Sequence, residues 1–247
     1  MNETARNFLR VNDLRKTFLP NGKTVRALDG FSLDAEAGSF TAIVGKSGCG
    51  KTTLLKCIAG LERPDSGTVR FSGKAGIVFQ DPRLLPWLTV EGNLALALRD
   101  RQSSVLEETL ALVGLEGWGG AYPRQLSGGM AQRASLARCL CRKPDLLLLD
   151  EPLSALDSFT RSRLRKELER ICRGHTVLLV THDVEEAVYL GDRVVFMERG
   201  RIQSEFAVTL SRPRNYRDGA FQEICAAVDG AGQNADEQDT DGQDTNR

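Results

Sequence analysis

A glycine-rich segment at residues 45–53, which reads GKSGCGKTT, contains the residue types that bind phosphate groups. It fits the pattern G-x-x-x-x-G-K-[ST] through Gly45, Gly50, Lys51 and Thr52. In such a loop, the glycines let backbone N–H groups approach the phosphates, the lysine reaches the β- and γ-phosphate oxygens, and the hydroxyl ligates Mg²⁺. The segment predicts binding of a nucleoside triphosphate, but it does not distinguish a kinase, a GTPase and an ATPase.

A second segment of similar makeup, LSGGMAQRASLAR at residues 126–138, places a serine and two glycines just before a run with helical character. A helix N-terminus preceded by such residues is also a common anion-binding site. One bound nucleotide needs only one such anion-binding site. The second site, at residues 126–130 and called the second cradle below, therefore needs an explanation of its own.

Two adjacent acids, Asp150 and Glu151, end the apolar run of the segment DLLLLDEP at residues 145–152. Ligands bind at the carboxyl ends of strands in open α/β sheets, so Asp150 is a candidate to hold Mg²⁺ directly or through water. Neighbouring strand residues face opposite ways, so Glu151 is a candidate general base that polarises the attacking water. Taken alone, the pair could also be the solvated or capping end of a strand.

The elements that must position these residues alternate between strands and helices. Residues 39–45 form a β-rich run that leads through the glycine loop into an expected helix at 51–60, closed by Gly60 in a left-handed cap. A solvated helix is expected at 158–173 and a pair of strands at 193–206. Three further apolar runs lack alternation, as is typical of parallel strands buried on both faces: 75–80, 145–150 and 176–181. The pattern predicts an α/β fold around a mainly parallel sheet.

The composition, with 247 residues of which 41% are hydrophobic, fits one large globular domain or a main domain with a small lobe. Lys plus Arg and Asp plus Glu number 33 each, so the net charge gives no indication of nucleic-acid binding. No apolar run approaches the roughly 18 residues that span a bilayer. The six cysteines form no CxxC pair and the N-terminus has no secretion-type apolar stretch, which predicts reduced thiols in a cytosolic protein. Residues 229–247 are polar and acidic and are expected to be disordered.

Taken together, these motifs resemble the ATPase subunit of ATP-binding cassette (ABC) transporters, in that family's order and over nearly the whole chain. The matching segments are Walker A at 45–53, the Q-loop IVFQDP at 77–82, the signature LSGGM at 126–130, Walker B LLLLDE at 146–151, the D-loop SALD at 154–157 and THD at 181–183. The resemblance implies an α/β P-loop NTPase (RecA-like) core with an N-terminal antiparallel β subdomain and an α-helical signature subdomain. It implies a nucleotide-binding domain at residues 8–228, with the helical subdomain at about 82–140.

The same resemblance implies roles for individual residues. The catalytic residues would be Glu151, His182 and Gln80, and the Mg²⁺ ligands would be Thr52, Gln80 and Asp150. The nucleotide would be bound by Phe18, which stacks on adenine, and by Gly45, Lys46, Ser47, Gly48, Cys49, Gly50, Lys51, Thr52, Thr53, Ser127, Gly128 and Gly129. Position 130 is Met where the family usually has Gln, and a methionine cannot make the hydrogen bonds of an amide.

The family's architecture explains the second cradle. It implies that Ser127, Gly128 and Gly129 bind the γ-phosphate of an ATP held on the loop of a second copy, so that two chains sandwich two nucleotides. ATP then favours closure, and hydrolysis removes the bridging phosphate. The implied partners are this second copy, an integral-membrane permease and, indirectly, an extracytoplasmic solute-binding protein; no nucleic acid is implied. The chain would lie peripherally on the cytoplasmic face of the plasma membrane.

Residues 79–94, FQDPRLLPWLTVEGNL, resemble the corresponding segment of bacterial importers for nitrate, sulfonate and taurine. The expected function is therefore ATP hydrolysis that energises import of a small oxyanion or sulfonate-like solute. The apolar cluster at 83–90 is expected to receive a helix of the permease, or else to pack the helical subdomain. Two other functions remain open, namely the ATPase of an exporter or lipoprotein-release complex and a soluble cassette ATPase acting on nucleic acid.

Overall fold

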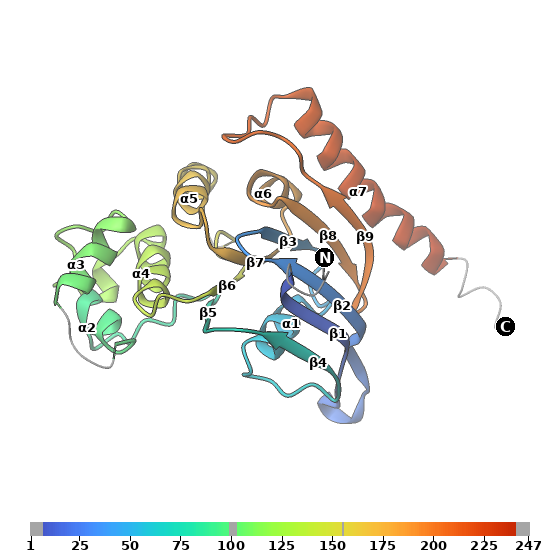
Figure 1. Cartoon of the computed structure of the whole chain (residues 1–247), viewed down its shortest axis with the longest axis horizontal. Coiled ribbons are helices and arrows are strands. Elements are labelled where there is room, and N and C mark those ends of the chain that lie inside the picture. Colours follow the sequence, from blue (N-terminus) through green and yellow to red (C-terminus); the bar gives the residue numbers. More distant parts are fainter. Residues whose placement is uncertain (1–6, 99–102, 155, 241–247) are drawn as a thin grey trace, which may run out of the picture. The chain divides into compact units, whose positions relative to one another are not determined.

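The computed structural model describes residues 7–98, 103–154 and 156–240 of the chain (Figure 1). The chain forms two compact units, one from the residues up to Phe71 and from Leu178 onward, the other from Ser72 to Val177. The second unit is therefore an insertion in the sequence of the first.

The first unit begins with an antiparallel sheet. Its strands are β1 (Asn7–Phe18), β2 (Val25–Glu36) and β4 (Ser66–Phe71), in the order β2-β1-β4. Val11 on the central strand pairs with Leu33 on one side and Val69 on the other, and Leu9 and Val11 are fully buried. A 3₁₀ helix, η2 (Pro20–Gly22), follows β1. This sheet confirms the predicted antiparallel β subdomain.

A second sheet of the first unit carries the strands that lead to the predicted site. Its strands are β7 (Thr176–Thr181, within this unit from Leu178), β3 (Phe40–Val44), β8 (Arg193–Glu198) and β9 (Arg201–Ala207), in that order. β3 and β8 are parallel, whereas β8 and β9 are antiparallel. Every residue of β3 and β7 is buried, which explains why these runs are apolar without alternation.

The helices of the first unit are α1 (Lys51–Ile58), α6 (Val184–Leu190) and α7 (Gly219–Thr240). α1 ends as predicted, because Gly60 has a φ of +71°. The N–H of Leu61 donates to the carbonyl of Lys56 at 2.9 Å, which completes the hydrogen bonding of a left-handed cap.

The C-terminal segment differs from its prediction. Residues 229–240, expected to be disordered, form the second half of α7, which packs against α6, β8 and β9 (Figure 1). Phe221, Cys225 and Val228 are buried at helical spacing and anchor the first half. The helix then continues because adding residues to a formed helix costs much less than starting one, and residues 219–240 contain no proline. Residues 241–247 lie outside the described residues.

The second unit contains two parallel strands and several helices. The strands are β5 (Ala75–Val78) and β6 (Leu146–Asp150), and Val78 pairs with Leu149. The helices are α2 (Val90–Ala95), α3 (Ser103–Leu112), the 3₁₀ helix η3 (Pro123–Gln125), α4 (Gly128–Leu140) and α5 (Ser158–Ile171). Thr89, Ser127 and Asp157 cap α2, α4 and α5 through side-chain oxygens, which explains where these helices begin.

Within the described residues, we find no helix whose length and apolar character would allow it to cross a bilayer.

Candidate active site

The loop between β3 and α1 contains the glycine-rich motif, and two of its glycines are required by close backbone contacts. A Cβ atom at Gly45 would lie 2.2 Å from the carbonyl oxygen of Met197, and one at Gly50 would lie 2.0 Å from the carbonyl oxygen of Ala27. Gly50 also has a φ of +110°, a conformation that side chains disfavour. The loop can therefore keep this path only with glycine at both positions.

Lys51 opens α1 and turns back over the loop. Its side chain is buried, and Nζ donates to the carbonyl of Gly45 at 2.6 Å and of Lys46 at 3.0 Å. No side chain of the described residues caps the N-terminus of α1, so its first N–H groups face the loop without a competing acceptor from a cap. A buried ammonium beside the N-terminus of a helix fits a polyphosphate.

The other residues of the loop differ in their exposure to solvent. Lys46, Ser47, Gly48 and Thr52 are exposed and Thr53 is half-buried. Cys49 is buried, and burial raises the pKa of its thiol although the nearby Lys51 ammonium offsets part of this effect. Cys49 therefore fills space beneath the loop rather than acting as a nucleophile.

His182 follows β7 and is held by a short hydrogen-bonded turn. The hydroxyl of Thr181 donates to Glu186 at 2.5 Å and accepts from the N–H of Asp183 at 3.1 Å, and Asp183 caps α6. His182 lines the same cavity of about 410 Å³ as Gly45 and Lys46. The structure thus brings the predicted histidine to the beginning of the predicted phosphate loop.

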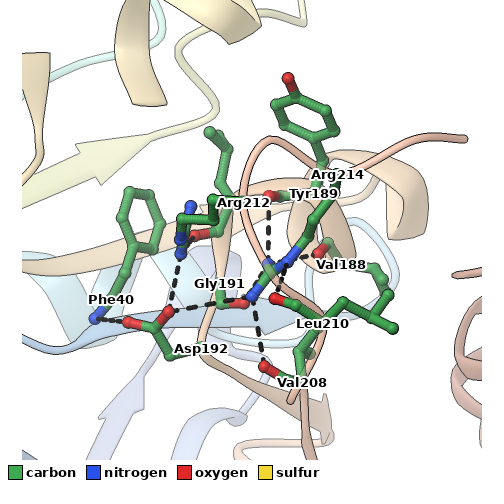
Figure 2. A network of polar contacts seen from close by, with 10 residues as sticks. Phe40, Val188, Tyr189, Gly191, Asp192, Val208, Leu210, Arg212 and Arg214 are labelled. Carbon is green, nitrogen blue, oxygen red and sulfur yellow. Dashed lines mark hydrogen bonds and ion pairs between the residues drawn. The ribbon is translucent and has the colours of Figure 1, made fainter. Parts of the chain in front are cut away.

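A buried arginine, Arg214, ties the end of α6 to the segment after β9 (Figure 2). The guanidinium of Arg214 donates to backbone carbonyls at the end of α6 and after β9, namely those of Val188, Tyr189, Gly191, Val208 and Leu210. Asp192 accepts from the N–H of Phe40 at 2.9 Å and from Arg212 at 2.7 Å. The network fixes the start of β3, which leads to the loop, and the C-terminus of α6, which follows His182. No motif in the sequence indicated it.

Phe18 is the last residue of β1 and is 37% exposed. The Nζ of Lys16 lies 5.2 Å from the ring centroid. A partly exposed ring at the end of a strand can stack on a base, as the resemblance implies for this position.

In the second unit, Asp150 and Glu151 lie at the end of β6. Asp150 is buried, and Glu151 is half-buried with a φ of +45°, where the chain turns out of the strand. Val78 of β5 pairs with Leu149 of β6, and Gln80 and Glu151 each lie two residues beyond this pair. Ser154 joins them: its hydroxyl accepts from Nε2 of Gln80 at 3.1 Å and donates to the carbonyl of Glu151 at 3.0 Å. The prediction did not assign a role to Ser154, although its place in the SALD motif was a signal; Ala155 of that motif lies outside the described residues.

The signature segment forms the N-terminus of α4. The hydroxyl oxygen of Ser127 accepts from the N–H of Met130 at 3.3 Å, and Ser127 and Gly128 are exposed. Gly129 is buried, and a Cβ atom there would lie 2.9 Å from Thr160 and 3.2 Å from Leu164 of α5. One glycine of the signature is thus explained by close helix packing, and the exposed residues remain candidates for binding an anion.

The predicted site residues therefore fall into two sets. The first unit holds Phe18, the loop at 45–53 and His182, whereas the second unit holds Gln80, Asp150, Glu151 and the signature. Asp229 of α7 also lines the cavity beside the loop, and it lies in the segment whose composition had predicted disorder.

Comparisons with known proteins agree with this arrangement. An ABC transporter family match covers residues 28–154. An aliphatic sulfonates import ATP-binding protein of Streptomyces avermitilis is 48% identical over 227 residues, which cover 91% of this chain and 86% of that protein. A protein of the same name from Granulibacter bethesdensis is 49% identical over 200 residues, with 80% and 84% covered.

Solved structures show the same fold. The dimeric structure of MJ0796, a bacterial ABC transporter cassette, has a TM-score of 0.74 at 30% identity and covers 82% of this chain and 100% of that chain. A dimeric post-hydrolysis state of the same cassette, bound to ADP and Pi, has a TM-score of 0.73 at 30% identity, with the same coverage. The chain therefore belongs to the ABC transporter family and contains its ATPase domain.

Proposed function

We propose that this chain is the ATP-hydrolysing subunit of a membrane importer for a sulfonate-type solute. The observation that carries the proposal is the loop at 45–53, built for phosphate around Lys51, in a chain 48% identical to a sulfonate-import ATP-binding protein. The relatives named for sulfonate import match most of the chain, which favours a role in import over a role in export or in acting on nucleic acid.

The loop holds the triphosphate of ATP in this proposal. Backbone N–H groups of residues 45–53 and the N-terminus of α1 meet the phosphate oxygens, and Lys51 meets the β- and γ-phosphates. Phe18 stacks on the adenine. The buried position of Lys51 supports its role, because an ammonium screened from water interacts more strongly with phosphate.

Residues present in the chain also fit Mg²⁺. Thr52 offers an exposed hydroxyl in the first turn of α1, Asp150 offers a carboxylate at the end of β6, and Gln80 offers an amide oxygen. Such hard oxygen donors are those that Mg²⁺ prefers. When bound, the ion neutralises charge on the β- and γ-phosphates.

Glu151 is the proposed general base, and Gln80 and His182 orient the groups around it. Glu151 polarises the attacking water, and Gln80 is held close to the backbone of Glu151 through Ser154. His182 contacts the γ-phosphate, which its place beside Gly45 and Lys46 supports.

A second copy of the chain completes each site. Ser127 accepts a hydrogen bond in its helix cap, so its O–H remains a donor for the γ-phosphate bound to the other copy. The amides of Gly128 and Gly129 add the N-terminus of α4. The dimeric structures of the similar cassette support this assembly.

The membrane partner is a permease that docks on the second unit, which places the chain on the cytoplasmic face of the membrane. A groove of about 400 Å³ is lined by Leu85, Leu96 and Arg138 among others, and Trp87, which follows Leu85 closely in the sequence, is 69% exposed. An open apolar groove with a cationic rim suits an amphipathic helix of the permease. A solute-binding protein outside the membrane would deliver the solute to the permease.

Growth of a strain that lacks this gene tests the function. We expect no growth on an alkanesulfonate as sole sulfur source, normal growth on sulfate, and rescue by the wild-type gene but not by Glu151→Gln. Unchanged uptake of labelled alkanesulfonate in the deletion strain would overturn the assignment, and a defect confined to nitrate would reassign the solute.

A further inference from the structure

The C-terminal helix α7 forms one wall of the cavity beside the phosphate loop. The cavity of about 410 Å³ is lined by Gly45 and Lys46 of the loop, by His182, and by Val228, Asp229 and Gly232 of α7. Its volume lies within the range of small-molecule sites, about 300–1,000 Å³. All of these residues belong to the first unit, so the cavity is complete within it.

α7 is held at this wall by an apolar stripe that ends in a glycine. Phe221, Cys225 and Val228 are buried, and Gly232 continues their four-three-four spacing. A Cβ atom at Gly232 would lie 3.3 Å from the ring of Phe196 on β8. The missing side chain lets the helix approach β8 closely, three residues after Asp229.

Three side chains that can carry charge line the cavity: Lys46, His182 and Asp229. Lys46 can attract a phosphate and His182 can donate a hydrogen bond to one, whereas the Asp229 carboxylate repels it. Asp229 is exposed to the water of the cavity.

We propose that α7 is part of the nucleotide site and that Asp229 is an autoinhibitory residue, which weakens binding of the γ-phosphate in the isolated subunit. This inference rests on the proposed function, in which the loop and His182 hold that phosphate. Asp229 acts through Coulomb repulsion, so it affects nucleotides in proportion to their phosphate charge and leaves the adenine contacts unchanged.

The first experiment measures binding of ATP, ADP and AMP to the purified chain by calorimetry. We expect Asp229→Asn to tighten ATP binding about threefold, a size typical of repulsion across a water-filled cavity at moderate salt. The change is smaller for ADP and absent for AMP, and high salt reduces it. Glu223→Gln is the matched control, because Glu223 is an exposed acid of the same helix that does not line the cavity.

Two glycine variants test the position of α7 at the cavity without changing its charge. Gly232→Ala brings a Cβ atom to 3.3 Å from the ring of Phe196, a tight contact that we expect to shift the helix by a few tenths of an ångström, whereas a Cβ atom at Gly230 has nothing within 4 Å. Both substitutions raise the helix propensity of α7 equally, so the two variants differ only in whether the helix is displaced. We expect Gly232→Ala, but not Gly230→Ala, to tighten ATP binding in the same direction as Asp229→Asn.

Equal ATP affinity in Asp229→Asn and Glu223→Gln, or weaker binding in Asp229→Asn, would overturn the inference. Loss of the fold in Asp229→Asn, seen by circular dichroism, would assign the residue a structural role instead. A wild-type chain that binds no ATP would contradict the proposed function itself, a result distinct from wild-type binding that Asp229→Asn leaves unchanged.

Discussion

Gln80 and Ser154 are joined by a 3.1 Å hydrogen bond from the side-chain amide to the hydroxyl, and the same hydroxyl donates to the backbone carbonyl of Glu151 at 3.0 Å. Two residues with predicted roles in hydrolysis therefore share one positioning residue. The parallel pairing of β5 and β6 makes this possible, because it brings the ends of the two strands to the same edge.

We expect Ser154→Ala to lower kcat for ATP hydrolysis about threefold to tenfold with little change in KM, because one hydrogen bond is worth about 0.5–1.5 kcal/mol. Ser154→Thr keeps the hydroxyl and should restore most of the activity. Ser158→Ala, an exposed serine nearby, is the control.

A double-mutant cycle decides whether Ser154 acts through Gln80. If it does, Ser154→Ala has little further effect in a Gln80→Ala background, so the two changes are not additive. Full additivity would mean that the contact does not position Gln80 for hydrolysis.

The central strands and the phosphate loop were predictable, because short continuous apolar runs and the spacing of Gly45, Gly50 and Lys51 are local signals. The left-handed cap at Gly60 was predictable for the same reason. By contrast, the link from Gln80 through Ser154 depends on the pairing of two strands that are far apart in the sequence. Residues 229–240 were predicted incorrectly because average composition does not register the buried stripe that anchors α7 from Phe221 onward.

The thiols offer a direct check on the packing. All six cysteines are buried, and burial, as the main cause, raises the pKa of Cys57 to about 11 and of Cys139 to about 12. We expect N-ethylmaleimide near neutral pH to label the folded chain slowly, because the thiolate is the reactive form, and to label all six thiols rapidly in denaturant. The raised pKa values also lower the free energy of unfolding as the pH rises above about 9, since the unfolded thiols ionise first.

Mass spectrometry identifies any thiol that reacts. Stoichiometric labelling of Cys49 within minutes would contradict its place beneath the phosphate loop, and protection by ATP would then show that the loop opens in solution.

The proposed permease groove predicts that transport and hydrolysis can be separated. Trp87→Asp changes a 69% exposed side chain, so it should leave the basal ATPase rate and the thermal unfolding midpoint close to wild type. It should reduce uptake in cells and stimulation of the ATPase by the permease about tenfold, as expected for an aromatic interface residue. Leu85→Glu, at a half-buried position lining the groove, should act similarly but also lower stability.

The matched control is Trp118→Asp, since Trp118 is also an exposed tryptophan, at 42%, but lies outside the apolar cluster at 83–90. Normal uptake with Trp87→Asp would remove this surface from the permease interface. Loss of basal ATPase and of folded protein would show instead that the cluster packs the unit.

The second cradle predicts that each active site is built from two copies of the chain. Lys51→Ala removes a buried ammonium that the loop carbonyls hold, and Ser127→Arg blocks the N-terminus of α4, so each variant alone should lose at least about 99% of its activity. Mixing the two should restore part of it, because one site of the mixed dimer then combines an intact loop from one chain with an intact signature from the other. A site formed within a single chain could not recover in this way.

Failure to recover is also expected if both sites must hydrolyse together, so the dimer needs a measurement of its own. Glu151→Gln removes the proposed base but keeps the side-chain volume and the turn at the end of β6, so bound ATP should persist and hold two chains together. Light scattering with Mg-ATP should then report a dimer that reverts to monomers when ADP replaces ATP, since only the γ-phosphate bridges the copies. Introducing Ser127→Arg into the same chain is the control, because it leaves the loop able to bind ATP but removes the bridge. A Glu151→Gln chain that binds ATP and stays monomeric, with its permease present or absent, would show that Ser127 and the glycines after it serve only to begin α4.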